Sequence, residues 1–259
     1  MLFNKIKIQL FFFILLFAAI SGCKEKNTEA IPSTPKSETG SITFNLNALI
    51  DGEDLELESK VFLNPLDESF LVKKFAFYIS DIKLLKDDQI VYTIPDSYIL
   101  YDKSKPNFNN VKFSNIPLGS YTGLEFTFGI DSVRNYSGAG EGALDPINGM
   151  YWTWNTGFIN LKFEGEWISP DTNTTFIYHL GGFRQPYYSY RIVEPANNLS
   201  FSIGNNNNTT IYIDAEINKF FGDVQPMSFS QNQVIMDPSS LSAKLSNNCA
   251  RMFKINRIE

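Results

Sequence analysis

The sequence predicts an all-β domain, folded as an antiparallel β-sandwich with a short C-terminal helix. Short alternating or β-rich runs separated by turn residues fill most of the chain, no long amphipathic helix or sequence repeat interrupts them, and a single helix signal stands near the end. The predicted strand runs cover residues 42–48, 60–63, 70–84, 89–94, 97–101, 121–130, 157–166, 174–181, 198–203 and 209–217.

Residues 1–22 have the pattern of a bacterial lipoprotein signal peptide. Lys5 and Lys7 precede an apolar run over residues 10–20, which is followed by Ser-Gly-Cys ending at Cys23. The run is about half of the ~20 residues that a membrane-spanning helix needs, which disfavours a transmembrane anchor. We therefore expect cleavage before Cys23 and lipidation of its side chain. Lys24, in place of the aspartate that commonly retains lipoproteins at the inner membrane, favours the outer membrane.

Residues 23–40 are expected to form a disordered tether behind the lipidated Cys23. They are polar and contain Pro32 and Pro35 among Ser, Thr, Lys and Glu, a composition that cannot bury enough apolar surface to fold. The tether would hold the folded domain away from the membrane.

The charge of the mature chain disfavours nucleic-acid binding. Two of the 22 basic residues precede Cys23 and none of the 28 acidic residues does, so cleavage leaves a formal charge of −8. Such a chain has no basic surface that could replace the counterions of a phosphate backbone.

Residues 41–259 are predicted to form the sandwich domain, and no second linker divides them. A chain of this length is long enough for a sizeable hydrophobic core. With Cys23 lipidated, Cys249 is the one remaining thiol, so packing without a disulfide must stabilise the domain. We expect Cys249 to be an inert, partly buried side chain.

The run 209–217 shows the alternation most clearly. One set of side chains is apolar and would face the core: Ile211, Ile213, Ala215 and Ile217. The other set would face water, so we expect Asp214 and Glu216 to be solvated. The asparagines at 205–208 predict a turn before this strand, because asparagine tolerates left-handed backbone and bonds to its own main chain.

The helix signal lies near the C-terminus. Asp237 is placed to cap the helix, Pro238 suits its first turn, and Leu241 and Leu245 are four residues apart on one face.

Trp152 and Trp154, two of the three tryptophans, stand in the most informative stretch of the chain. They follow turn residues at 145–149 and precede the alternating run 157–166. This stretch, with Gly-Ile-Asp at 129–131 before it and His-Leu-Gly-Gly-Phe at 179–183 after it, closely resembles the copper-binding MbnP-like domain family. The resemblance covers roughly residues 41–253, with the motifs in family order.

The resemblance implies a copper-binding role without catalysis by the chain itself. In the family, the histidine at the position of His179 helps to bind copper, and one tryptophan of the stretch that holds Trp152 and Trp154 is oxidised to kynurenine. A dihaem cytochrome c peroxidase-like partner carries out this oxidation, and the oxidised ring supplies a further ligand. His179 is the only histidine in the chain, and its imidazole suits copper.

The C-terminal residues depart from the family pattern. A Met-Phe pair matches Met252 and Phe253, but where the family commonly ends in His-x-His this chain has Arg257 and Glu259. Arginine has no lone pair for a metal. The Glu259 carboxylate, or Cys249 with Met252 as soft sulfur ligands, could replace the missing imidazoles. Alternatively, His179 is a hydrogen-bonded strand residue and the tryptophans are core aromatics.

Other chemistry has less support. The chain has no nucleophile elbow, phosphate loop or dinucleotide fingerprint, so no catalytic residues are assigned. Asp131 and Asp145 stand at turns, where they would either bind calcium or cap backbone amides. The loop from Arg184 to Arg191 mixes arginine with tyrosine, which favours a protein or glycan contact. A binding module that uses this loop and no metal is therefore the alternative function.

Overall fold

The computed structural model describes residues 38–259, except for residues 156, 170–172, 196–198, 206 and 223. The predicted signal peptide, Cys23 and nearly all of the predicted tether therefore lie outside the described residues. No helix within the described residues is long and apolar enough to span a membrane. The first strand begins at Thr39.

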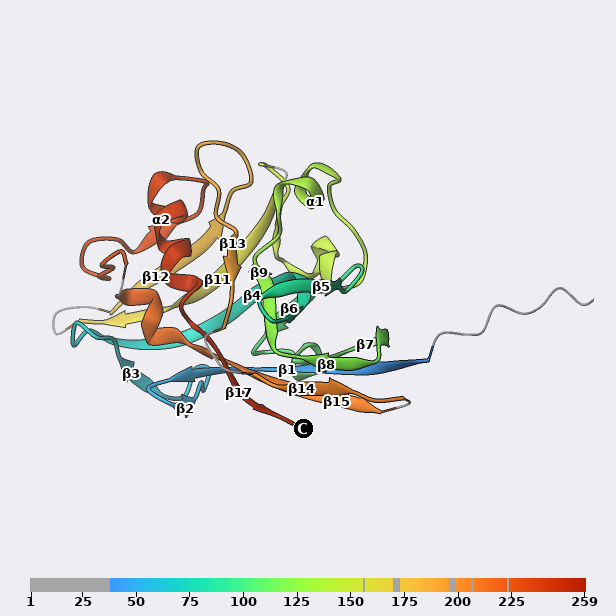
Figure 1. The fold of residues 1–259 in the computed structure, drawn as a ribbon. Coiled ribbons are helices and arrows are strands. Elements are labelled where there is room, and N and C mark those ends of the chain that lie inside the picture. Colours follow the sequence, from blue (N-terminus) through green and yellow to red (C-terminus); the bar gives the residue numbers. More distant parts are fainter. Residues whose placement is uncertain (1–37, 156, 170–172, 196–198, 206, 223) are drawn as a thin grey trace, which may run out of the picture. The chain divides into compact units, whose positions relative to one another are not determined.

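Two curled sheets make up the domain (Figure 1). The five-stranded sheet has the order β17-β15-β1-β2, and β7 also pairs with β1. Its strands are β1 (Thr39–Ile50), β2 (Glu53–Asp54), β7 (Asn110–Pro117), β15 (Asn208–Glu216) and β17 (Phe253–Ile258).

The ten-stranded sheet has the order β13-β9-β4-β11-β12-β16, while β3, β5 and β6 also pair with the long strand β4, and β10 pairs with β11. Its strands are β3 (Val61–Leu63), β4 (Ser69–Lys86), β5 (Gln89–Thr93), β6 (Ile99–Asp102), β9 (Gly123–Phe128), β10 (Tyr151–Trp152), β11 (Gly157–Ile168), β12 (Asn173–Gly181), β13 (Arg191–Val193) and β16 (Val234–Ile235). A separate pair joins β8 (Gly119–Tyr121) to β14 (Phe201–Ile203).

The predicted all-β sandwich is confirmed, but the sheets are mixed and not strictly antiparallel. β1 runs parallel to β15, with Phe44 opposite Ile211, and β12 runs parallel to β16. Alternation of apolar and polar residues predicts which side chains face the core and contains no information on strand direction. β1 and β15 are also far apart in the sequence, so no hairpin turn fixes their relative direction.

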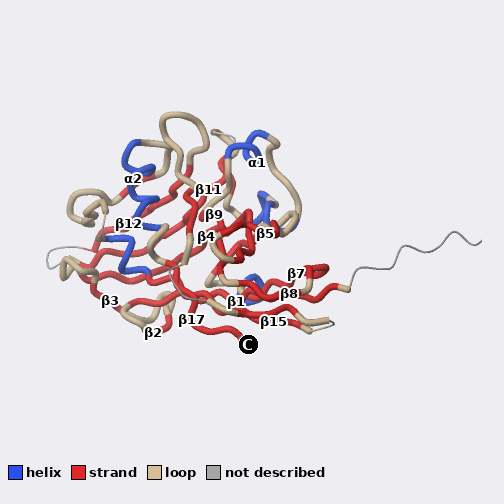
Figure 2. Tube along the Cα trace, in the orientation of Figure 1, coloured by secondary structure: helices blue, strands red, loops and turns tan. Residues whose placement is uncertain are grey.

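Helices are few and lie at the periphery of the strands (Figure 2). The α-helices are α1 (Ser132–Tyr136) and α2 (Ser240–Cys249), and the 3-10 helices are Pro106–Phe108, Gly142–Leu144, Pro146–Asn148 and Ile217–Phe221. The predicted helix near the C-terminus is confirmed as α2, but Ser239 and not Asp237 is its cap, because the Ser239 hydroxyl accepts a hydrogen bond of 3.2 Å from the Ser242 amide. The chain then continues into β17.

The main core lies between the two sheets and is rich in phenylalanine. Phe163 of β11 is in edge contact with Phe75, Phe176 and Phe220. Cys249 belongs to this core and is completely buried, more deeply than predicted. Since the described residues contain no second cysteine, aromatic packing takes the place of covalent cross-links within them.

A smaller apolar cluster covers part of the outer face of the ten-stranded sheet. It contains buried side chains of Tyr78, Met150, Trp152, Phe158 and Ile159. The predicted turn holds this cluster in place: Asp145 accepts a hydrogen bond from the Ile147 amide, and Gly149 adopts a left-handed conformation with φ 72°. The chain therefore reverses into β10 and brings Trp152 onto the sheet.

Candidate functional site

His179 lies on the outer face of the ten-stranded sheet. Its strand neighbours Tyr178 and Leu180 enter the main core, so the strand alternation directs His179 to the opposite face. There its Nε2 lies 2.6 Å from Oε1 of Glu164 on the adjacent strand β11. His179 is 8 % exposed, which makes it a nearly buried imidazole with a carboxylate partner.

The neighbouring imidazole changes the pKa of the Glu164 carboxyl. The hydrogen bond from His179 is the largest influence and lowers the pKa of Glu164 below its ordinary value, although partial burial acts in the opposite direction. Glu164 is therefore held in the ionised form, in which it can accept a hydrogen bond or a cation.

Lys162 continues the polar row beside Glu164. It stands opposite His179 in the sheet register and donates a hydrogen bond of 2.5 Å to the carbonyl of Gly149. Burial lowers the pKa of Lys162. On the next strand Lys74 pairs with the fully buried Asp102 at 2.7 Å. These charged groups bind to one another and to backbone, so they order the surface around His179.

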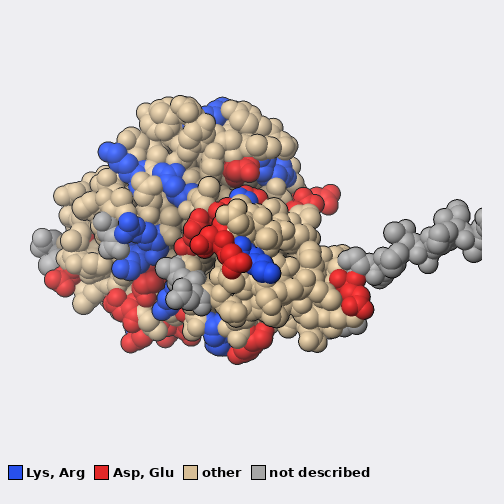
Figure 3. All heavy atoms as spheres, viewed as in Figure 1, with Lys and Arg blue, Asp and Glu red and all other residues tan. Residues whose placement is uncertain are grey.

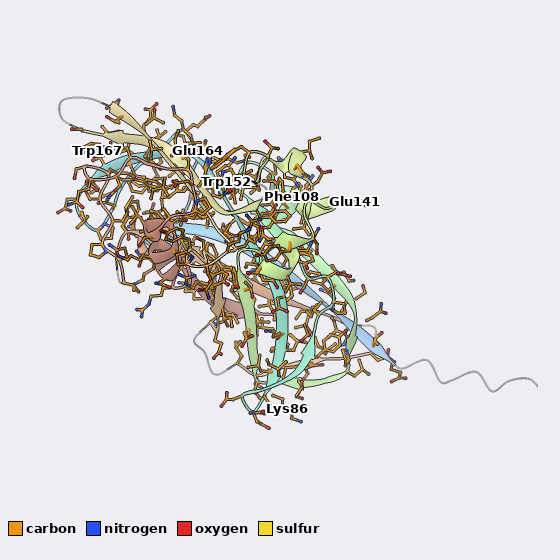
Figure 4. All side chains as sticks on the ribbon, turned by 90° about the horizontal axis from the view of Figure 1, so that it is seen from above. Lys86, Phe108, Glu141, Trp152, Glu164 and Trp167 are labelled. Atoms are coloured by element: carbon orange, nitrogen blue, oxygen red, sulfur yellow. The ribbon has the colours of Figure 1, made fainter. Side chains whose placement is uncertain are left out.

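The ring of Trp152 packs against Gly181, which lies on β12 two residues beyond His179. A Cβ atom on Gly181 would lie 2.5 Å from Cζ3 of Trp152, so the indole can pack there only because residue 181 is glycine. Trp152 is 4 % exposed, and its Nε1 has no hydrogen-bond partner among the described residues. Figure 4 shows Trp152 and Glu164 at one end of the domain, remote from Lys86.

Trp154 is the exposed neighbour of Trp152. The two ring centroids are 5.6 Å apart, with an angle of 47° between the ring planes. Trp154 is 65 % exposed, whereas Trp152 is buried. The structure therefore places Trp152 against the strand that carries His179 and separates the two tryptophans into an inner and an outer ring.

The proposed replacement ligands lie elsewhere. Arg257 and Glu259 are joined by an ion pair of 2.8 Å on the five-stranded sheet, and Tyr212 also donates to Glu259. Cys249 and Met252 are enclosed in the main core, and burial raises the pKa of the Cys249 thiol well above its ordinary value. Glu259, Cys249 and Met252 therefore do not complete a metal site with His179. Within the described residues, no three His, Cys, Asp or Glu side chains are grouped to hold a metal ion.

The two turn aspartates, which the sequence left as calcium ligands or caps, both act as caps of backbone amides. Asp131 caps α1 by accepting a hydrogen bond of 2.7 Å from the Arg134 amide. Asp145 accepts one of 2.9 Å from the Ile147 amide. Both carboxylates therefore satisfy backbone donors, as is usual for aspartate at turns.

The loop from Arg184 to Arg191 lies beside the tryptophans. Arg191 is anchored to α2 through a hydrogen bond of 2.5 Å to Oδ1 of Asn247. Between the other end of the loop and the Trp152 segment is a cavity of about 120 Å³, lined by Trp152, Asn155, Gly157, Gly182, Phe183, Arg184, Gln185, Tyr187 and Pro238. The loop therefore belongs to the same region of the surface as the tryptophan pair.

Sequence reasoning did not identify Glu164 and Lys162 as parts of the site. The alternation in 157–166 already places both on the face opposite Phe163. Their proximity to His179 depends on the register between β11 and β12, which contains a bulge between Ile159 and Leu161. That irregularity cannot be read from the sequence alone.

Comparison with known protein families identifies a match. The family model described as MbnP matches residues 39–237 of this chain. A solved structure described as MbnP from Methylosinus trichosporium is similar at 14 % sequence identity, with a TM-score of 0.49, and the alignment covers 77 % of this chain and 81 % of that one. No protein with a curated description matches the sequence.

Proposed function

Because this chain belongs to the MbnP family, as the sequence motifs predicted, we propose that it is a copper-binding protein of the bacterial cell envelope and not itself an enzyme. Its Cys23 would carry the lipid anchor, with the outer membrane as the expected location. The observation that chiefly supports the copper proposal is that the sole histidine is paired with Glu164 on the sheet face where Trp152 packs two residues away.

The donor chemistry fits copper in part. The His179 imidazole suits copper, and the adjacent Glu164 carboxylate would add an oxygen ligand if copper replaced the hydrogen bond between the two groups. Two donors do not complete a site. We propose that oxidised Trp152 supplies the third, because its ring is fixed against Gly181 on the strand that carries His179. Bound copper would give the protein a redox-active cation.

We propose that the outer tryptophan, Trp154, is where a partner protein would contact the domain. Trp154 is largely exposed and its ring lies 5.6 Å from that of Trp152. A dihaem peroxidase-like partner could therefore contact Trp154 and withdraw electrons from Trp152 through it. This arrangement would allow a buried ring to be oxidised without a haem group entering the domain.

Copper titration of purified variants tests the two protein donors. We expect His179→Ala and Glu164→Gln each to weaken copper binding by about tenfold or more, since each removes one donor. Glu166→Gln is the matched control, because Glu166 is the next outward-facing carboxylate on β11 and pairs with the partly exposed Lys73. Equal copper affinity in the wild type, His179→Ala and Glu164→Gln would refute the proposed ligands.

The alternative function uses the cavity between the Trp152 segment and the loop from Arg184 to Arg191. It is lined largely by aromatic and backbone groups, with Tyr187 38 % exposed at its rim, and such surfaces are typical of protein contacts. If the native protein carries neither copper nor an oxidised tryptophan, the informative experiment compares the partners that the wild type and Tyr187→Ala bind.

A further inference from the structure

A polar hollow lies on the outward face of the five-stranded sheet, away from the tryptophan site. Its volume is about 370 Å³, within the range of roughly 300–1,000 Å³ typical of small-molecule sites. Three neighbouring strands, β1, β15 and β17, and the segment before β7 contribute its lining: Asn45, Leu46, Asn47, Asn109, Tyr212, Asp214, Asn256 and Arg257.

The lining contains hydrogen-bonding groups that the protein does not use itself. Neither Asn45 nor Asn109 forms a side-chain hydrogen bond to another described residue, and Oδ1 of Asn109 is buried without a partner. Amide groups that the protein does not use for its own hydrogen bonds are available to an external partner. Primary amides offer both donors and acceptors, which complements a ligand whose groups also do both.

Asp214 is the unexpected member of the lining. The strand pattern predicted that it is solvated, but it is 4 % exposed. Burial raises the pKa of this carboxyl, although the charge of Lys254 and a hydrogen bond with Asn256 act in the opposite direction. In its ionised form this carboxyl group accepts hydrogen bonds from donors in the hollow.

The hollow has little net charge. The guanidinium of Arg257 lies 3.6 Å from the centre of the Tyr212 ring and forms an ion pair of 2.8 Å with Glu259, so its charge is already matched. Asp214 is the only other ionisable group of the lining that would carry a full charge at neutral pH. This balance disfavours binding of a free anion. The lining also has too few carboxylates for calcium, which takes six to eight oxygen ligands.

We propose that this hollow is a carbohydrate site, in which Asn45, Asn109 and Asp214 bind the hydroxyl groups of one sugar residue. A sugar is neutral and presents hydroxyls that both donate and accept, so it matches the amides and the carboxyl group without requiring a counter-ion. The inference depends on neither copper nor the tryptophan pair, because the hollow belongs to the other sheet.

Saturation-transfer NMR of the purified protein with single monosaccharides tests the proposal. The probes are glucose, galactose, mannose and N-acetylglucosamine. We expect saturation transfer to at least one of them, reduced about tenfold or more in affinity by Asn45→Ala and by Asp214→Asn, since each removes a direct hydrogen bond. Asn107→Ala is the matched control, because Asn107 is exposed and lines a different hollow.

Circular dichroism of both variants distinguishes loss of binding from loss of folding. Two independent variants are used so that one misfolded protein does not decide the result. The proposal is overturned if none of the four sugars receives saturation, or if binding persists unchanged in both folded variants. Binding of Ca²⁺ that is lost in Asp214→Asn, with no sugar bound, would equally overturn it, because the hollow would then be a cation site.

Discussion

At the scale of single residues, the pairing of His179 with Glu164 determines what the site can do. An imidazole alone on an apolar strand would be a weak ligand, whereas a carboxylate at 2.6 Å orients the ring. The sequence identified the histidine because it is unique. It did not identify the carboxylate, whose proximity depends on strand register.

The pair predicts a specific dependence of stability on pH. Because the folded-state pKa of Glu164 lies below its ordinary value, its stabilising contribution is complete above the unfolded-state pKa of about 4.3 and is lost as the pH falls through the lower folded-state value. We expect Glu164→Gln to lose less unfolding free energy than the wild type between about pH 6 and about pH 3, as measured by urea unfolding of the metal-free protein. The same acid slope in both proteins would show that the pair is not formed.

A second residue-scale prediction concerns Gly181. An added Cβ would lie 2.5 Å from the Trp152 ring and 2.8 Å from the Phe158 carbonyl, so moving the ring alone cannot relieve the clash. Gly181→Ala should destabilise the protein by about 1–3 kcal/mol and shift its tryptophan emission.

Thr175→Ala on the same strand is the control for this change, because Thr175 is exposed to solvent. Its unfolding free energy should stay within about 0.5 kcal/mol of the wild type. If Gly181→Ala were as stable as the control and had unchanged emission, the packing of Trp152 on β12 would be wrong.

At the scale of elements, α2 shows where sequence signals compete. Asp237 and Pro238 suggested an early start, but the helix begins at Ser240, and Leu245 is completely buried as expected. Ser239→Ala should therefore cost about 1 kcal/mol of unfolding free energy, while Asp237→Ala, at an exposed position, should change it by less than about 0.5 kcal/mol. Urea titrations of both variants measure this, and the reverse order would place the cap at Asp237.

Strand positions were predictable from the sequence, and strand partners were not. The run 157–166 matches β11, and 209–217 matches β15, because alternation reports which side chains face the core. The parallel pairing of β1 with β15 arises from contacts over more than 150 residues of chain. Asp214 was misjudged for a related reason: the outer face of a strand is solvated only where nothing else covers it.

At the scale of the whole molecule, the sandwich separates its two candidate sites. The tryptophan and histidine region lies on the ten-stranded sheet, and the polar hollow lies on the five-stranded sheet. Acidic and basic residues both occur in small groups on the face shown in Figure 3. The family motifs point to the first region because tryptophan and histidine are rare. The hollow is built from common asparagines, whose convergence only the folded sheet reveals.

The most direct test of the copper account is the intact mass and copper content of the protein isolated from its own host, where any oxidising partner is present. We expect a mass gain for conversion of one tryptophan to kynurenine, mapped by peptide sequencing to Trp152, with about one copper ion per chain that His179→Ala loses. A chain with both tryptophans unmodified and no copper would contradict it.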